Sequence, residues 1–548
     1  MPTPGELPTA LRAQWAALRA GRGRIIALAA AALAVLLLGL LPAVTNRSSC
    51  SAGTVEVPCP TAPAGPDGAP VSDVAFFAHR PLGERGVITV RMTDMTGTIT
   101  YPPPDHDEIV PGLVPWAKAG IMIKDGTRQG ADYAALLMTG DHGVRMQHGF
   151  RHDVAGRPGR VSPQEPRWLR LTRDGDTVTG EESADGTTWT RVGTARLPGL
   201  PATAQVGLFA TSPSDLTLVE VGLGGRIGQA RFTQAVGYFD HVTVEGAAAG
   251  PWQADTIGEL GHTDWEKYHR PAGLVERDGT LAVTGSGDIG PISTEGGTNP
   301  ETVLLGLVVA LIVVIVVGAR FAVRPGAAAD TRGAADAAGV ADTRGAADTR
   351  GAGNGTAADA TDAPDVAGAG RSLVAKALVL GGVVFAGGLV TAAVTLTAGT
   401  MLLRHGGQAV VPFAPLTGLR VAAGAAALLA GAAMLAVALG ALLRRTWAAV
   451  TAGLVLAVLP YLLGAVPLLP DAVVRWQLSL TPAAGYAMLQ TAQEYPQVIA
   501  HYVPYAGYYP LPGWAGLAVL GGYVALALLL AVRSRRAGGT APAEADYR

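Results

Sequence analysis

The chain has 548 residues, of which 49% are hydrophobic and only 15% charged. This composition is too apolar for an ordinary soluble protein, so we expect several membrane-spanning helices together with a polar, separately folded part. The formal net charge of −2 offers no positive field for steering nucleic acid, and we expect no nucleic-acid partner.

Residues 1–24 are predicted to form an amphipathic helix on the cytoplasmic surface of the membrane, because apolar residues recur there at helical spacing beside arginines. The apolar residues are Leu7, Leu11, Trp15 and Leu18. Residues 25–44 follow as an uncharged run of about the 20 residues that a spanning helix needs. We interpret this run as a first span that is retained, because it is long for a signal peptide and has a weak cleavage context.

Residues 45–70 form a predicted linker that holds both cysteines of the chain, Cys50 and Cys59. The linker is rich in Ser, Pro and Gly, where a small covalent loop can close, and an extracellular position favours a disulfide. The alternative is a pair of unpaired thiols. A zinc site would need further ligands at suitable spacing, and none are nearby.

Residues 71–291 change to short alternating runs broken by Gly, Asp and Pro, which indicates antiparallel strands. The clearest stretch is 167–193, where the pairs Asp174-Gly175 and Asp185-Gly186 separate alternating runs and predict a β-meander. Further strands are expected at 86–92, 119–123, 133–138, 144–148, 204–210 and 238–244. So many short strands without a helix predict an all-β sandwich.

Five runs of this region resemble, in their order, the concanavalin A-like sandwich often attached to bacterial glycosidases. They are "WAKAGIMIKDG", "YAALLMTGDHGVRMQ", "RWLRLTRDGDTVTGEESADGTTWTRVG", "VGLFATSP" and "FDHVTVEG". The run 279–291, "GTLAVTGSGDIGP", looks like the strand that usually opens such a domain, yet it stands at the end. The resemblance therefore implies a circular permutation that brings both domain ends beside the membrane.

A lectin-like fold does not by itself establish sugar binding. Trp116, Trp168 and Trp189 are candidates for stacking on a sugar ring, and burial in the sandwich core is the alternative. The run from Asp105 to Glu108 is either a cation site or, as we prefer, a solvated loop. We expect no metal, no cofactor and no catalytic residues.

Five further apolar runs predict spans at residues 302–319, 374–401, 419–443, 446–466 and 512–532. The last four are rich in Gly and Ala, which lets helix backbones approach closely in lipid and favours a packed six-helix bundle. The segment 467–511 is too polar to span and rich in Tyr and Trp. It is predicted to form short interfacial or re-entrant helices on the outer face.

The loop 320–371 repeats the sequence "ADTRGAAD" and has almost no large apolar side chain, so we expect it to be disordered in the cytoplasm. The tail 533–548 carries Arg533, Arg535 and Arg536. Together with the arginines before the first span and between the fourth and fifth spans, the tail places both termini in the cytoplasm. The predicted location is therefore the plasma membrane, with multiple passes and the sandwich outside.

The apolar runs also resemble ABC-2 type transporter permeases, particularly an actinobacterial group. This resemblance rests on "ALRAQWAALRAGRGRIIALAAAALAVLLLGLLPA", "RSLVAKALVLGGVVFAGGLVTA", "LGALLRRTWAAVTAGLVLAVLPYLL" and "LTPAAGYAMLQ". It implies a dimer of permease chains, homo- or heteromeric, that binds a separate ATP-binding subunit. The chain itself has no GxxxxGK[ST] loop for nucleotide phosphates.

In this family the loop between spans two and three presents a short helix to the ATP-binding subunit, and here the repeat replaces it. Candidate coupling contacts are instead the N-terminal helix and four basic residues. These are Arg371, Lys376, Arg444 and Arg445.

Two functions follow from the sequence. The leading interpretation is a permease subunit, most simply an exporter, whose external domain modulates access. The alternative is a membrane-anchored carbohydrate or cell-wall sensor without transport activity. Because the spans carry almost no polar side chains, a lipid-like or amphipathic cargo is favoured, although a purely structural bundle would have the same character.

Overall fold

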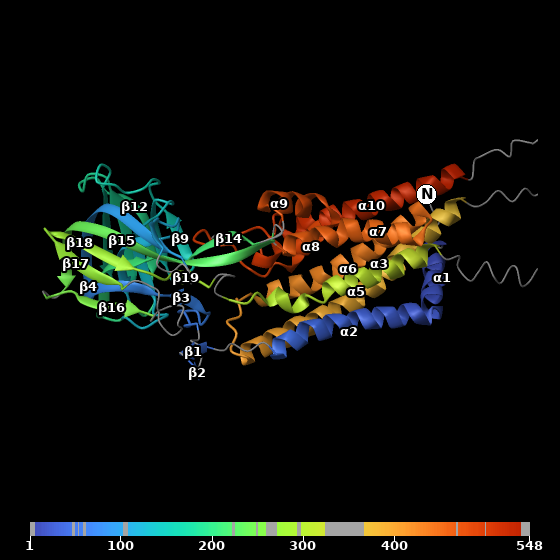
Figure 1. The fold of residues 1–548 in the computed structure, drawn as a ribbon, viewed down its shortest axis with the longest axis horizontal. Helices are drawn as coiled ribbons and strands as arrows, with labels where there is room; N and C mark the ends of the chain where they lie inside the picture. The colour runs from blue at the N-terminus through green and yellow to red at the C-terminus, as the bar shows by residue number, and fades with distance from the viewer. Residues whose placement is uncertain are drawn as a thin grey trace, which may run out of the picture.

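The computed structural model describes residues 6–45, 50–52, 54–57, 62–101, 108–221, 225–247, 250–258, 271–292, 297–323, 366–466, 469–498 and 500–538. The described chain has two parts, a β-rich part and a bundle of helices that extends away from it (Figure 1). We call the end of the bundle beside the β-rich part the near end and the opposite one the far end.

The β-rich part is built from a large antiparallel sheet and two short strand pairs. Its strands are β1 (Cys50–Ala52), β2 (Val55–Val57), β3 (Val71–Asp73), β4 (Ala75–Thr100), β5 (Ile109–Pro111), β6 (Lys118–Lys124), β7 (Tyr133–Thr139), β8 (Val144–His148), β9 (His152–Ala155), β10 (Arg167–Asp174), β11 (Thr177–Ser183), β12 (Thr190–Arg196), β13 (Ala204–Thr211), β14 (Asp215–Val221), β15 (Gly225–Ala247), β16 (Gln253–Ile257), β17 (Gly273–Arg277), β18 (Thr280–Gly285) and β19 (Ile289–Pro291). All the strands predicted from alternation lie within these elements.

The long strand β4 holds the sheet together, because its beginning pairs with β13 and its middle with β10. The main sheet runs in the order β12-β11-β10-β4-β13-β6-β7-β8-β9, and β15 lies along β4 on the side away from β10. The strands curve around an apolar core, so this part is a β-sandwich closed almost to a barrel. The all-β prediction is confirmed at this level.

Two apolar clusters explain why β6 and β7 are buried along their whole length. Successive side chains of a strand point to opposite faces. Ile121 and Leu136 therefore join the main core, while Met122 and Tyr133 join a second cluster with Phe150. The segment that opens the domain covers this second cluster, and β3 pairs there with β19. Both ends of the domain thus lie side by side.

The predicted β-meander is present in the described chain. Asp174 pairs with Thr177, so β10 and β11 are joined by a two-residue turn in which Gly175 has a φ of 61°. β11 continues into β12 through Gly186, whose φ is 73°. Positive φ costs glycine nothing, which is why the Asp-Gly pairs mark these turns in the sequence.

The described helical part contains six helices long and apolar enough to cross a membrane, at the positions predicted from hydropathy. Its elements are α1 (Glu6–Ala20), α2 (Arg22–Thr45), η2 (Pro300–Leu304), α3 (Leu307–Val323), α5 (Val366–His405), α6 (Pro415–Leu443), α7 (Thr446–Ala457), α8 (Leu459–Ala465), α9 (Asp471–Leu480), η3 (Pro482–Leu489), η4 (Pro504–Ala506) and α10 (Gly513–Gly538). Figure 1 shows α1 lying across the far end of the bundle.

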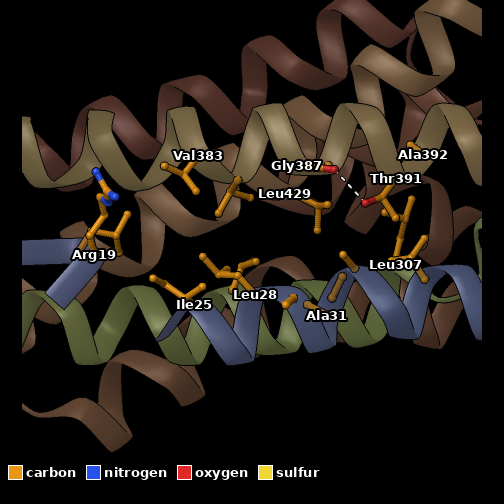
Figure 2. A pocket seen from close by; sticks show the side chains of 18 of the residues that line it. Arg19, Ile25, Leu28, Ala31, Leu307, Val383, Gly387, Thr391, Ala392 and Leu429 are labelled. Carbon is orange, nitrogen blue, oxygen red and sulfur yellow. Dashed lines mark hydrogen bonds between the residues drawn. The ribbon is translucent and has the colours of Figure 1, made fainter. Parts of the chain in front are cut away.

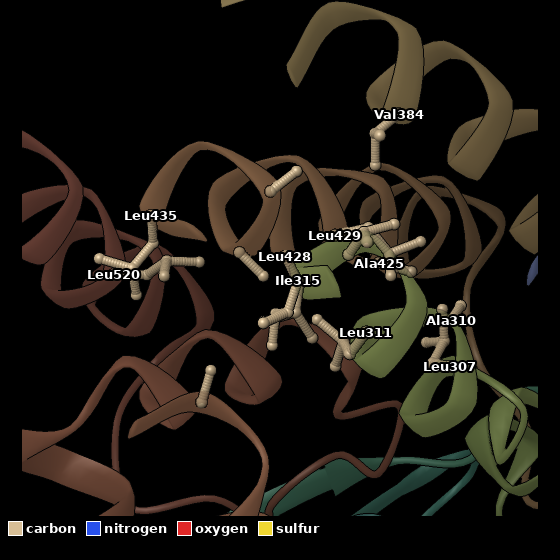
Figure 3. Packing of buried hydrophobic residues seen from close by; sticks show 14 of the residues in the cluster. Leu307, Ala310, Leu311, Ile315, Val384, Ala425, Leu428, Leu429, Leu435 and Leu520 are labelled. Atoms are coloured by element: carbon tan, nitrogen blue, oxygen red, sulfur yellow. The ribbon is translucent and has the colours of Figure 1, made fainter. Parts of the chain in front are cut away.

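Helices α3 and α6 form the centre of the bundle, where Leu311, Ile315 and Leu428 pack together (Figure 3). Small residues bring the two backbones into contact. A Cβ built on Gly318 would lie 2.7 Å from the carbonyl oxygen of Ala433. Close approach at glycine is the packing mode that the Gly- and Ala-rich spans predicted.

Several predicted boundaries are corrected by the structure. Helix α3 continues to Val323 and α5 begins at Val366, so both helices enter the segment 320–371 that was predicted as a loop. The repeat itself lies outside the described residues. The fifth span is two helices, because Pro460 lacks the N–H that would continue α7 into α8. The candidate second span begins at Pro300 and therefore includes Glu301.

The segment between α8 and α10 forms short helices at the near end. There Thr491 donates a hydrogen bond from its hydroxyl to the Glu301 carboxylate. Nearby, Gln497 Nε2 donates to the backbone oxygen of Phe150 in the sandwich, at 3.4 Å. The near end therefore contacts both the second candidate span and the β-rich part.

Candidate binding groove in the helical bundle

An apolar groove of about 400 Å³ opens between α2 and α5. Figure 2 shows Ile25, Leu28 and Ala31 of α2 facing Val383 and Gly387 of α5 across this space. Helices α1, α3 and α6 supply the remaining walls. A volume of this size falls in the range of about 300–1,000 Å³ that small-molecule sites occupy.

The lining is almost entirely aliphatic. Trp15, Arg19 and Thr391 are the lining residues with polar side-chain atoms, and all others are aliphatic or glycine. The Thr391 hydroxyl donates to the carbonyl oxygen of Gly387 at 2.8 Å, so this group is satisfied within its own helix (Figure 2). The groove therefore suits an apolar chain, with a guanidinium at one end.

The groove exists because α2 packs closely against the bundle only in its second half. A Cβ built on Gly39 would lie 2.0 Å from the carbonyl oxygen of Val303, and one on Gly306 would lie 2.5 Å from Val35 Cα. Such contacts hold α2 against η2 and the start of α3. The first half of α2 faces Gly387 of α5. A Cβ built on Gly387 would have no heavy atom within 4 Å, so a space stays open between the two helices.

Helix α2 is also the least buried of the candidate spans in the described chain. Only 17% of its most apolar 18-residue stretch is buried, whereas 78% is buried in the corresponding stretch of Pro415–Leu443. The low burial of α2 places it at the edge of the bundle, beside the tight α3–α6 centre.

Cationic groups gather at the far end of the groove. The Arg24 guanidinium carbon lies 4.8 Å from the ring centroid of Phe321, and Lys376 Nζ lies 5.6 Å from the same ring. A second groove of about 440 Å³, on the other side of α2, is lined by Arg24 and Arg320. Cation–π contacts of this kind hold charged side chains against an apolar wall.

The predicted coupling residues fall into two groups in the structure. Arg371 and Lys376 lie near the start of α5, where Gln14 of α1 donates a hydrogen bond to the Ser372 hydroxyl at 3.2 Å. Arg444 and Arg445 form the junction of α6 and α7 and are exposed. The groove itself was not predicted from the sequence. The signals that could have indicated it are the Gly387-Gly388 pair and the small residues along α2.

The three tryptophans predicted as sugar-stacking residues do not form one site. Trp116 is buried, with the His142 ring stacked on it at 4.0 Å and the Arg145 guanidinium carbon 5.6 Å from its centroid. Trp168 lies instead on the outer face of β10. Its neighbours Leu169 and Leu171 point into the core, as alternation requires.

Trp168 and Trp189 each have an arginine beside the ring. The Arg170 guanidinium carbon is 4.0 Å from the Trp189 centroid, and that of Arg91 is 5.9 Å from Trp168. Arg91 also donates to Asp240 at 2.7 Å, a hydrogen bond that lowers the pKa of this carboxyl group. Both rings therefore take part in cation–π contacts, and their proposed role in sugar stacking stays a prediction.

Two other sequence predictions fall outside the described residues. Cys59 is one of them, so the disulfide with Cys50 stays a prediction. The acidic run that begins at Asp105 is the other. Among the described residues, no group of three or more His, Cys, Asp or Glu side chains is arranged to hold a metal ion.

Comparison with known proteins gives no family. No family model matches the chain, and no curated protein matches it. A functionally unknown protein from Saccharomyces cerevisiae is 18% identical, with 38% of this chain and 95% of that chain covered and a TM-score of 0.18. Scytalido-glutamic peptidase is 9% identical, with 39% and 99% covered and a TM-score of 0.25. A GH43 protein from Bacillus licheniformis is 12% identical, with 27% and 26% covered and a TM-score of 0.16. TM-scores this low carry no argument on fold or function.

Proposed function

We propose that the chain is the membrane-spanning permease subunit of an ABC-2 type transporter, an exporter driven by a separate ATP-binding subunit. The observation that carries the proposal is the apolar groove beside α2, the least buried of the candidate spans in the described chain, with α1 at its far end. A permease needs a cargo path next to an element that can move, and in this proposal the groove is the path and α2 is the moving element.

In this proposal, α1 transmits movement to the groove. Leu18 of α1 is buried in the bundle core, Arg19 lines the groove, and Gln14 is bound to Ser372. A displacement of α1 would therefore change the groove and the start of α5 together. The ATP-binding subunit would contact α1 and the basic residues Arg371, Lys376, Arg444 and Arg445. Two permease chains would form a dimer that binds this subunit.

The external domain would control access at the near end. We infer that it is a concanavalin A-like sandwich that is circularly permuted, since β18 and β19 close the domain beside the strand β3 that opens it. Each end of the domain then connects to a span, so the domain is an insertion between α2 and α3. In this proposal the protein is located in the plasma membrane. Gln497 and Phe150 join it to the near end.

The test is the ATPase activity of the complex formed by the tagged chain and its co-purified ATP-binding subunit, in nanodiscs. Gly387→Leu fills the groove and should reduce cargo-stimulated turnover several-fold. Gly382→Leu on the same helix is the matched control, because Gly382 is outside the groove lining and likewise has nothing within 4 Å of its missing Cβ.

If no ATP-binding subunit co-purifies, or if ATP turnover is the same with and without this chain, the permease proposal fails. Specific glycan binding by the full chain under those conditions would support the carbohydrate sensor instead. Equal turnover of the two glycine variants, with a stimulated wild type, would remove the groove from the cargo path.

A further inference from the structure

A larger cavity of about 1,220 Å³ lies at the near end of the bundle and is separate from the groove. We call it the near-end pocket. Its walls come from the beginnings of α6 and α10, from helix α9, and from the segments that follow η3 and precede α10. Unlike the groove, the near-end pocket combines charged, aromatic and apolar side chains.

Two guanidinium groups line the near-end pocket. Arg420 donates a hydrogen bond to the backbone oxygen of Gln490, and the Arg475 guanidinium carbon lies 5.2 Å from the ring centroid of Tyr502. Each arginine is thus positioned by a neutral partner. These partners are a backbone carbonyl and an aromatic ring, so both guanidinium groups retain N–H donors suited to a phosphate group.

Two carboxylates line the same pocket. Glu494 accepts a hydrogen bond from the Tyr502 hydroxyl at 3.1 Å, and Asp471 stands in the first turn of α9. Within the described chain neither carboxylate is paired with Arg420 or Arg475. The near-end pocket therefore presents two positive and two negative groups that do not neutralise each other by direct contact.

Aromatic and apolar groups border the charged ones. Trp476 and Trp514 line the pocket and are 68% and 74% exposed. On α9, Val473, Trp476 and Leu480 are all exposed at helical spacing. A helix with such a face lies in a membrane interface, where tryptophan rings settle at the level of lipid headgroups.

We propose that the near-end pocket binds the headgroup of a phospholipid that carries both a phosphate and an ammonium group, the phosphatidylethanolamine class. Arg420 and Arg475 would hold the phosphate. Asp471 and Glu494, with the tryptophan rings, would hold the ammonium group. The acyl chains would lie along the exposed face of α9. The carboxylates disfavour a purely anionic headgroup, so the site selects by charge pattern. This inference needs the chain to be in a membrane but does not need transport.

The test is native mass spectrometry of the full chain in detergent, titrated with phosphatidylethanolamine, phosphatidylglycerol or diacylglycerol. The wild type should bind phosphatidylethanolamine most tightly. Arg420→Gln with Arg475→Gln should weaken that binding by at least about tenfold, the factor expected from the loss of a single charge-assisted hydrogen bond. Asp471→Asn with Glu494→Gln should remove the preference over phosphatidylglycerol.

Arg404→Gln is the matched control, because Arg404 is an exposed arginine at the end of α5 that does not line the pocket. It should bind as the wild type does. Elution volume and melting temperature of each variant identify a folding defect, and Arg420→Lys should restore part of the affinity. Equal binding of diacylglycerol, or equal phosphatidylethanolamine binding by all variants, overturns the proposal. Competition by inorganic phosphate alone, without lipid preference, would assign the site to free phosphate and also overturn it.

Discussion

Lys124 Nζ lies 2.8 Å from Asp73 Oδ2, and both side chains are fully excluded from solvent. Lys124 also donates to the backbone oxygen of Ala131, and the same Asp73 oxygen accepts from the Gly130 N–H. Burial lowers the pKa of Lys124, although the Asp73 charge acts in the opposite direction. The pair fastens the strand that opens the β-rich domain to the middle of the main sheet.

Lys124→Met is expected to lower the free energy of unfolding of the sandwich by about 3–5 kcal/mol, because it leaves Asp73 buried without its countercharge. Hydrogen exchange of the β6 and β7 amides in the full chain measures the change. The matched variant is Arg85→Met. It removes the exposed pair Arg85–Asp174, at 2.9 Å, and is expected to cost about 0–1 kcal/mol. Equal losses would contradict the role given to burial.

His148 should make the sandwich less stable in acid. Its ring stacks on that of His152 at 4.5 Å, and burial together with the His152 charge lowers the pKa of His148 from 6.5 to about 4. Between these values the unfolded chain binds a proton that the folded chain does not. Stability is therefore lost as pH falls from about 6.5 to 4. Asp67, Asp132, Arg151, Arg196 and Glu494 face the same crevice and add their own dependences.

Comparing variants isolates the histidine contribution. His148→Asn should show a smaller loss of β7 and β8 amide protection on acidification than the wild type. His152→Asn should give an intermediate loss, because it removes the repulsion but not the burial. If His148→Asn follows the wild-type pH dependence, the shifted imidazole is not the cause.

The sequence predicted those features that depend on local patterns. The alternation around Leu169 and Leu171 and the Asp-Gly turn at Gly175 appear in the structure where they were expected. Each is set by neighbouring residues, through the period of a strand or the φ that only glycine adopts freely. The six apolar runs were equally readable, since length and hydropathy define them.

The groove and the near-end pocket could not be read in this way. The groove arises because Gly39 contacts the backbone of Val303, whereas a Cβ built on Gly387 would have no atom within 4 Å. No local sequence pattern shows which of the two glycines faces a neighbouring helix. The near-end pocket brings Arg420 and Glu494 together from segments far apart in the chain. The surroundings of the three tryptophans could not be read either, because their positions in the sequence do not show which rings arginines contact.

Gly318→Val is expected to separate α3 from α6. It should lower the free energy of unfolding of the bundle by about 1–3 kcal/mol, the usual cost of overpacking a tight contact. The missing Cβ faces the carbonyl oxygen of Ala433 at 2.7 Å, which cannot move without its helix. Gly382→Val, on α5, meets no atom within 4 Å and should change the melting temperature little. Thermal unfolding in detergent compares the two, and similar losses would contradict close packing at Gly318.

The proposed topology predicts opposite accessibility for the two parts of the chain. In a background with Cys50 and Cys59 replaced by serine, Thr187→Cys stands on an exposed turn of the sandwich and should react with a membrane-impermeant maleimide on intact cells. Arg445→Cys, exposed at the junction of α6 and α7, should react only after permeabilisation. The physical reason is that arginines next to spans are retained in the cytoplasm, and most arginines that flank the candidate spans lie at the far end, opposite the sandwich. Labelling of Arg445→Cys in intact cells would show that the bundle has the opposite orientation. The far end would then lie outside the cell, where a cytoplasmic ATP-binding subunit could not reach it.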